Sequence, residues 1–98
     1  MRNMAKALIK VDVRSRATLL EMLRTQQEQR RVHGERSFSF CVNDDARHIG
    51  YIILEWESFR SVRKFVDSSF SRELIAEWPV VEVFEVLALR DIADDYDA

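Results

Sequence analysis

Apolar and polar residues alternate along four stretches of the chain, at residues 4–13, 37–42, 50–57 and 80–89. Alternation with a period of two is typical of β-strands, because successive side chains point to opposite faces of a sheet. In the third stretch, Ile52, Leu54 and Trp56 occupy one face, whereas Tyr51 and Ile53 occupy the other. Because both faces of this strand are apolar, we expect each face to pack against a further layer.

The segment between the first two strands has the pattern of an amphipathic helix. Ser15 can cap its first turn, and Gly34 can end it in the left-handed conformation that side chains with a Cβ disfavour. The apolar stripe stops at Leu23, and the residues that follow, RTQQEQRR, are polar on all sides. We therefore expect the second half of this helix to stand in water.

A second helical segment can begin at a Ser58 cap, restart near Ser68 and end at Pro79. The elements then follow the order β-α-β-β-α-β. Two right-handed β-α-β units in this order predict a ferredoxin-like α+β fold, with a four-stranded antiparallel sheet and both helical segments on one face. We expect residues 1–92 to form this single domain and residues 93–98 to form an acidic C-terminal tail.

Helices on one side leave the other face of the sheet open. That face would expose Tyr51, Ile53 and one side of the last strand, and an apolar patch of this kind usually marks a binding surface. Simple alternation groups Val83 with Leu87 on one side of the last strand, but both sides are apolar, so the pattern leaves open which of them joins the patch. Glu85 lies in this strand and is expected either to meet a basic group across a dimer interface or to act as a base.

The composition indicates in which cellular compartment the protein is expected and whether a membrane is among its partners. The chain has 98 residues, of which 47% are hydrophobic and 33% charged, as in an ordinary globular domain. The single Cys41 has no disulfide partner, which fits a reducing compartment. No apolar run is long enough for a signal peptide or a membrane span, so we expect a cytoplasmic protein without a membrane partner.

Charge and aromatic residues argue against nucleic acid. Residues 1–36 carry a net charge of +5 and residues 37–98 one of −7, which together give −2. RNA-recognition domains share the predicted strand order and stack bases on aromatic rings of the open face. Here the corresponding stretch, IGYIILEW, offers only Tyr51 on that face. We therefore expect no nucleic-acid partner.

Residues that could carry metal or acid-base chemistry are scattered. His33 beside a helix end and His48 in a hairpin loop are expected in solvent, and neither has a second ligand at a metal-binding spacing. Glu55 and Glu57 share one face of a strand and are expected to be solvated or paired with arginine. We expect no cofactor and no metal, and we assign no catalytic residue.

Residues 51–89 resemble the dimeric α+β barrel superfamily, in particular its antibiotic-biosynthesis-monooxygenase-like branch. The resemblance rests on an aliphatic strand ending in LEWES, a helix FRSVRKFVDSSFSREL that breaks at DSSF, and a final strand. It implies that two open sheet faces pack together in a homodimer. On that basis Tyr51, Ile53 and Glu85 are the expected interface residues.

The same resemblance suggests what the protein binds. Ligand-binding members form a pocket between helices and sheet, which here would include Trp56, Phe65 and Leu74, although Trp56 can equally be a core anchor. The axial histidine of the haem-degrading members falls at Leu74, so no haem is expected. We expect a self-associating protein that binds a small apolar ligand without catalysis. The alternative is a cofactor-independent monooxygenase-like enzyme acting on an aromatic or polyketide-like substrate.

Overall fold

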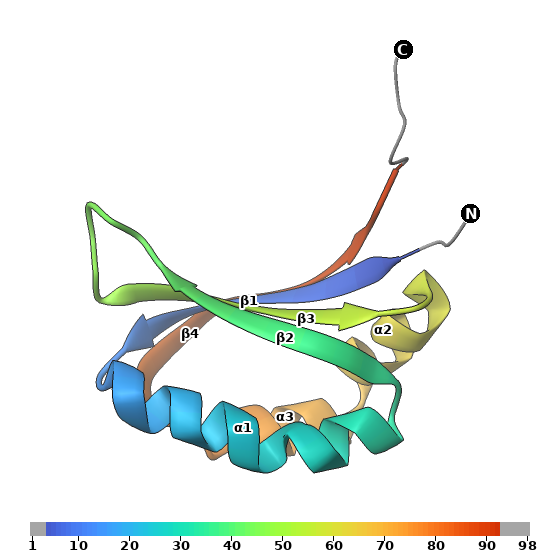
Figure 1. Cartoon of the computed structure of the whole chain (residues 1–98), viewed down its shortest axis with the longest axis horizontal. Coiled ribbons are helices and arrows are strands. Elements are labelled where there is room, and N and C mark those ends of the chain that lie inside the picture. Colours follow the sequence, from blue (N-terminus) through green and yellow to red (C-terminus); the bar gives the residue numbers. More distant parts are fainter. Residues whose placement is uncertain (1–3, 93–98) are drawn as a thin grey trace.

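The computed structural model describes residues 4–92 and has the predicted order of elements (Figure 1). These elements are β1 (Ala5–Val13), α1 (Arg16–Val32), β2 (Glu35–Val42), β3 (Ile49–Trp56), α2 (Phe59–Asp67), α3 (Ser69–Ala76) and β4 (Val80–Arg90). The second helical segment is two helices, because Ser68 ends α2 and its hydroxyl accepts a hydrogen bond from the Ser71 N–H at the start of α3. The expected acidic tail at residues 93–98 lies outside the described residues.

The four strands form one antiparallel sheet in the order β2-β3-β1-β4. The helices α1, α2 and α3 all lie on the same side of this sheet, and none of the helices in the described part of the chain lies on the opposite side (Figure 1). The predicted ferredoxin-like α+β fold is confirmed. Within residues 4–92, no helix is both long enough and apolar enough to cross a bilayer.

The core lies between the helices and the two central strands. From the sheet it receives alternate side chains of β1 and β3, and the helical layer supplies a matching apolar set. Its most buried members include Ala7, Ile9, Val11, Ile52, Leu54 and Trp56 from the sheet, and Leu19, Leu23, Val62, Phe65 and Leu74 from the helices. The predicted faces of the third strand are therefore confirmed.

The last strand departs from simple alternation. Its register against β1 shifts twice, so that Val81 and Phe84 are extra residues with no partner on β1. Each extra residue moves the following side chains to the other face, as a β-bulge does. Val83 consequently lies on the helix side together with Val86, whereas Leu87 lies on the other side. Grouping Val83 with Leu87 was therefore wrong.

The expectation that the second half of α1 stands in water is also wrong. The buried stripe of α1 continues past Leu23 through Gln26 and Arg30, which are 2% and 0% exposed. The Arg30 guanidinium donates to the Glu35 carboxylate from Nε and from Nη2, the latter over 3.3 Å, and Gln27 donates to the same carboxylate over 3.2 Å. Burial of Arg30 is thus matched by a buried carboxylate at the start of β2.

Gln26 makes a second buried polar contact, between α1 and α3. Its side-chain amide donates to the Leu74 carbonyl over 3.1 Å and to the Glu77 carboxylate over 3.0 Å, and its oxygen accepts from Trp78 Nε1 over 2.7 Å. A buried amide that makes three hydrogen bonds loses little of the solvation it had in water. These bonds fix the distance and the rotation of α1 relative to α3.

The Arg30–Glu35 pair predicts an asymmetric response to mutation. Arg30→Met leaves the Glu35 carboxylate buried without a cation, and we expect a loss of about 3–5 kcal/mol in the free energy of unfolding, measured by urea denaturation. Adding Glu35→Leu removes the stranded charge and should recover a large part of that loss. Arg24→Met on the exposed side of α1 is the control, and an equal effect of Arg24→Met and Arg30→Met would contradict the assignment.

Candidate functional site

The three residues predicted to contact a ligand lie in the core. Trp56, Phe65 and Leu74 are 0%, 4% and 5% exposed. The rings of Trp56 and Phe65 lie 4.9 Å apart, and a Cβ added at Gly34 would come within 3.2 Å of the Trp56 ring. Gly34 also has a φ of 112°, so it serves both the turn after α1 and the close approach to Trp56. The space around the indole is therefore filled, and a ligand contact at these three residues remains a prediction.

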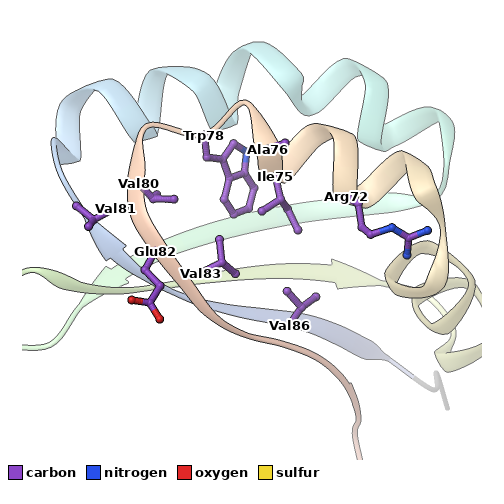
Figure 2. A pocket seen from close by; sticks show the side chains of 9 residues that line it. All are labelled: Arg72, Ile75, Ala76, Trp78, Val80, Val81, Glu82, Val83 and Val86. Atoms are coloured by element: carbon purple, nitrogen blue, oxygen red, sulfur yellow. The ribbon is translucent and has the colours of Figure 1, made fainter.

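An open hollow of about 400 Å³ lies at the edge of the domain, between α3 and β4. Figure 2 shows Ile75 and Trp78 reaching toward Val83, whereas the carboxylate of Glu82 points away from them. The residues that line it are Arg72, Ile75, Ala76, Trp78, Val80, Val81, Glu82, Val83 and Val86. It is a mostly apolar surface that a small apolar molecule could cover.

The sequence pattern missed this hollow because of the two bulges in β4. Alternation places Val83 and Val86 on opposite faces, and only the extra Phe84 brings both to the helix side. The residues around Trp78, which precedes Pro79, do not indicate that its side chain lines a pocket. None of the three core residues predicted to bind a ligand lines this hollow.

The side of the sheet opposite the helices is a second candidate surface, which we call the open face. Its apolar side chains are Leu8, Tyr51, Ile53, Phe84, Leu87 and Leu89. The register of β1 sets Leu8 opposite both Ile53 and Leu87, so these three form one row across the sheet. The open face therefore has a continuous apolar row that none of the helices α1, α2 and α3 covers (Figure 1).

All three predicted interface residues lie on this open face. Lys10 is the register partner of both Tyr51 and Glu85, so the three form a row beside the apolar one that contains Ile53. The Lys10 ammonium also lies 5.8 Å from the centre of the Phe84 ring, which places Phe84 on the same side. The structure thus brings Tyr51, Ile53 and Glu85 to one surface, and their role in an interface remains a prediction.

The scattered titratable residues do not gather into one site. His33 and His48 are exposed, as expected, and the His33 ring stacks on Phe70 with 4.0 Å between ring centres. Glu57 forms an ion pair with Arg36, which confirms the expected arginine partner. In the part of the chain that the structure describes, no three His, Cys, Asp or Glu side chains are grouped closely enough to hold a metal ion.

Comparison with solved structures identifies the architecture. A protein from Bordetella bronchiseptica, named as a candidate antibiotic biosynthesis monooxygenase, superimposes with a TM-score of 0.71 at 13% identity, over 94% of this chain and 100% of its own. One from Nitrosomonas europaea with the same designation gives 0.59 at 14% identity, over 97% and 94%. The chain has the fold of these proteins. The predicted resemblance to antibiotic-biosynthesis-monooxygenase-like proteins is thereby confirmed for the fold.

The fold is not confined to proteins with that designation. A conserved protein from Methanosarcina mazei gives a TM-score of 0.56 at 14% identity, over 93% of this chain and 95% of its own. No protein-family model matches the sequence, and no curated protein is similar to it at a significant level. At identities this low, the superpositions show a shared fold and no more. The function is therefore argued from the surfaces described above.

Proposed function

We propose that this protein acts as a homodimer in which two open sheet faces pack together into an α+β barrel, and that it binds a small apolar ligand without catalysis. The observation that carries the dimer is the uncovered apolar row of Leu8, Ile53 and Leu87. In a single chain, Leu87 of this row is 39% exposed, and Phe84 and Leu89 beside the row are 41% and 38% exposed. Monomeric proteins rarely leave such a contiguous patch in water.

The energy of covering this face favours association. Burying several hundred Å² of apolar surface per chain, at about 25 cal/mol per Å², corresponds to on the order of 10 kcal/mol for each chain. Two chains together then exceed the roughly 4–15 kcal/mol that association costs. A two-fold axis would cover both patches in one contact, because each chain presents the same surface to the other.

The charged row of the open face is compatible with this two-fold contact. It contains one cation, Lys10, and one anion, Glu85, next to each other across β1 and β4. A two-fold axis can bring Lys10 of one protomer to Glu85 of the other, so that both charges gain a partner in the interface. In this arrangement Glu85 forms an ion pair in the interface and does not act as a catalytic base.

For the ligand, we propose the hollow between α3 and β4 as the binding site. Ile75, Trp78, Val83 and Val86 provide its apolar lining. Packing around Trp56 supports this choice over the monooxygenase-like alternative, since an aromatic substrate beside Trp56 would need space that neighbouring side chains occupy. A cytoplasmic location is part of the proposal and rests on the single cysteine.

The dimer is tested by light scattering at micromolar concentration, where we expect the wild type to have twice the mass of one chain. Ile53→Glu places two charges in a dry interface and should give monomers or unfolded chains. Leu87→Glu is the sharper variant, because Leu87 is 39% exposed in the single chain and a monomer should tolerate the charge there. We expect Leu87→Glu to have the mass of one chain by light scattering and the circular dichroism spectrum of a folded protein.

The matched control for these variants is Val32→Glu. Val32 is 85% exposed on the helical side of the molecule, so its replacement should leave the dimer unchanged. A monomeric wild type would remove the barrel proposal. So would a Leu87→Glu variant that remains a dimer as stable as the wild type.

The ligand site is tested with toluene as the probe and the two indole N–H groups as NMR reporters. Toluene in the proposed hollow should shift the Trp78 signal in proportion to occupancy and leave that of Trp56 unchanged. Val83→Phe, which fills the hollow, should weaken the response about tenfold or more. A shift confined to Trp56 would instead place the ligand in the core, beside Phe65 and Leu74.

A further inference from the structure

A second hollow, of about 360 Å³, lies where the end of α1 meets α2 and the start of α3. It is lined by Val32, His33, Ser61, Lys64, Phe65 and Ser68. The Lys64 and His33 side chains come from different elements, and the turn at Gly34 brings the end of α1 to this place. This hollow is separate from the open face and from the hollow between α3 and β4.

The polar lining of this hollow favours negative charge. Lys64 contributes an ammonium, His33 an imidazole and Ser61 a hydroxyl group, whereas the Ser68 hydroxyl already donates to the Phe65 carbonyl. None of the described residues that line it is acidic. Asp67, the carboxylate of α2, is held by two hydrogen bonds of 3.1 and 3.2 Å from Arg63, and so it does not neutralise Lys64.

Helix ends do not add to this preference. Ser68 is the N-cap of α3 but also the C-cap of α2, and His33 is the C-cap of α1. The partial positive charge at the start of α3 is therefore offset by partial negative charge at the ends of α1 and α2. The preference for an anion consequently rests on the Lys64 ammonium and the His33 imidazole.

The apolar part of the hollow is aromatic and rigid. Phe65 forms its floor, and Phe65 in turn packs against Trp56 at 4.9 Å and against Phe70 at 6.1 Å. Phe70 also stacks beneath His33, at 4.0 Å. Because these rings support one another from the buried indole out to the imidazole, the floor and the His33 ring are fixed before any ligand arrives.

We propose that this hollow binds a small organic anion, namely a carboxylate attached to an aromatic body. The carboxylate accepts charge-assisted hydrogen bonds from Lys64 and the His33 imidazole, and the aromatic body covers the exposed Val32 side chain and the small accessible part of Phe65. A volume of about 360 Å³ with a few convergent polar groups on an aromatic floor is typical of a small-molecule site. The hollow is built within one protomer, so the inference does not depend on the proposed dimer.

The test is calorimetric titration with naphthalene-2-carboxylate and with its neutral twin, naphthalene-2-carboxamide. We expect the carboxylate to bind one-to-one, about tenfold or more tightly than the amide, because the amide carries no charge for Lys64. Lys64→Gln should weaken carboxylate binding by about tenfold and abolish most of the preference over the amide. His33→Phe, which keeps a ring on Phe70, should weaken it by several-fold.

Arg24→Gln is the matched control, since it also removes one positive charge, from the exposed side of α1, and binding should be unchanged. In NMR spectra, the His33 ring protons should shift on binding, whereas the Trp78 indole should not. Equal affinity for carboxylate and amide would overturn the proposal. An equal loss in Lys64→Gln and Arg24→Gln would overturn it too, as would acetate binding as tightly as the naphthalene probe.

Discussion

The structure depends on one constraint, namely a sheet with apolar side chains on both faces and helices on only one of them (Figure 1). On the helix side, Ile52, Leu54 and Trp56 are fully buried. On the other side, Leu8, Ile53 and Leu87 form a row that no helix or strand within residues 4–92 covers. Apolar surface of this extent favours a second layer, and a second copy of the same sheet is the layer that requires no other partner.

The helical layer is held to the sheet by buried polar contacts as well as by apolar packing. Arg30 joins α1 to Glu35 on β2, and Gln26 joins it to Trp78 beyond α3. These contacts fix where α1 ends, and the turn at Gly34 then brings His33 beside Phe70. The same rigid arrangement that fills the space around Trp56 thus leaves hollows at the edges of the layer, where ligands can reach them.

Prediction from the sequence succeeded where one element determined the outcome. The faces of the third strand and the caps at Ser15 and Ser58 follow from local spacing, and the structure confirms them. It failed where a contact between two elements decides the outcome. Arg30 at the end of α1 is buried because Glu35 at the start of β2 meets it, and the periodicity of the helix does not reveal that partner.

The candidate binding surfaces show the same difference between what local sequence patterns predict and what contacts between elements decide. Tyr51 and Ile53 share a face by strand alternation, so their common surface was predictable. The hollow of Figure 2 was not, because bulges in β4 bring Val83 and Val86 to one side. The hollow at His33 requires α1, α2 and α3 to meet, which is a property of the tertiary packing.

The most direct measurement of the central claim is an isotope-filtered NOE experiment on a mixture of labelled and unlabelled chains. It detects only contacts between protons of different chains. The account predicts strong intermolecular NOEs among the methyl groups of Leu8, Ile53 and Leu87 and the ring of Tyr51, and none at Val32. Intermolecular NOEs confined to the helical side, or none on the open face, would contradict it.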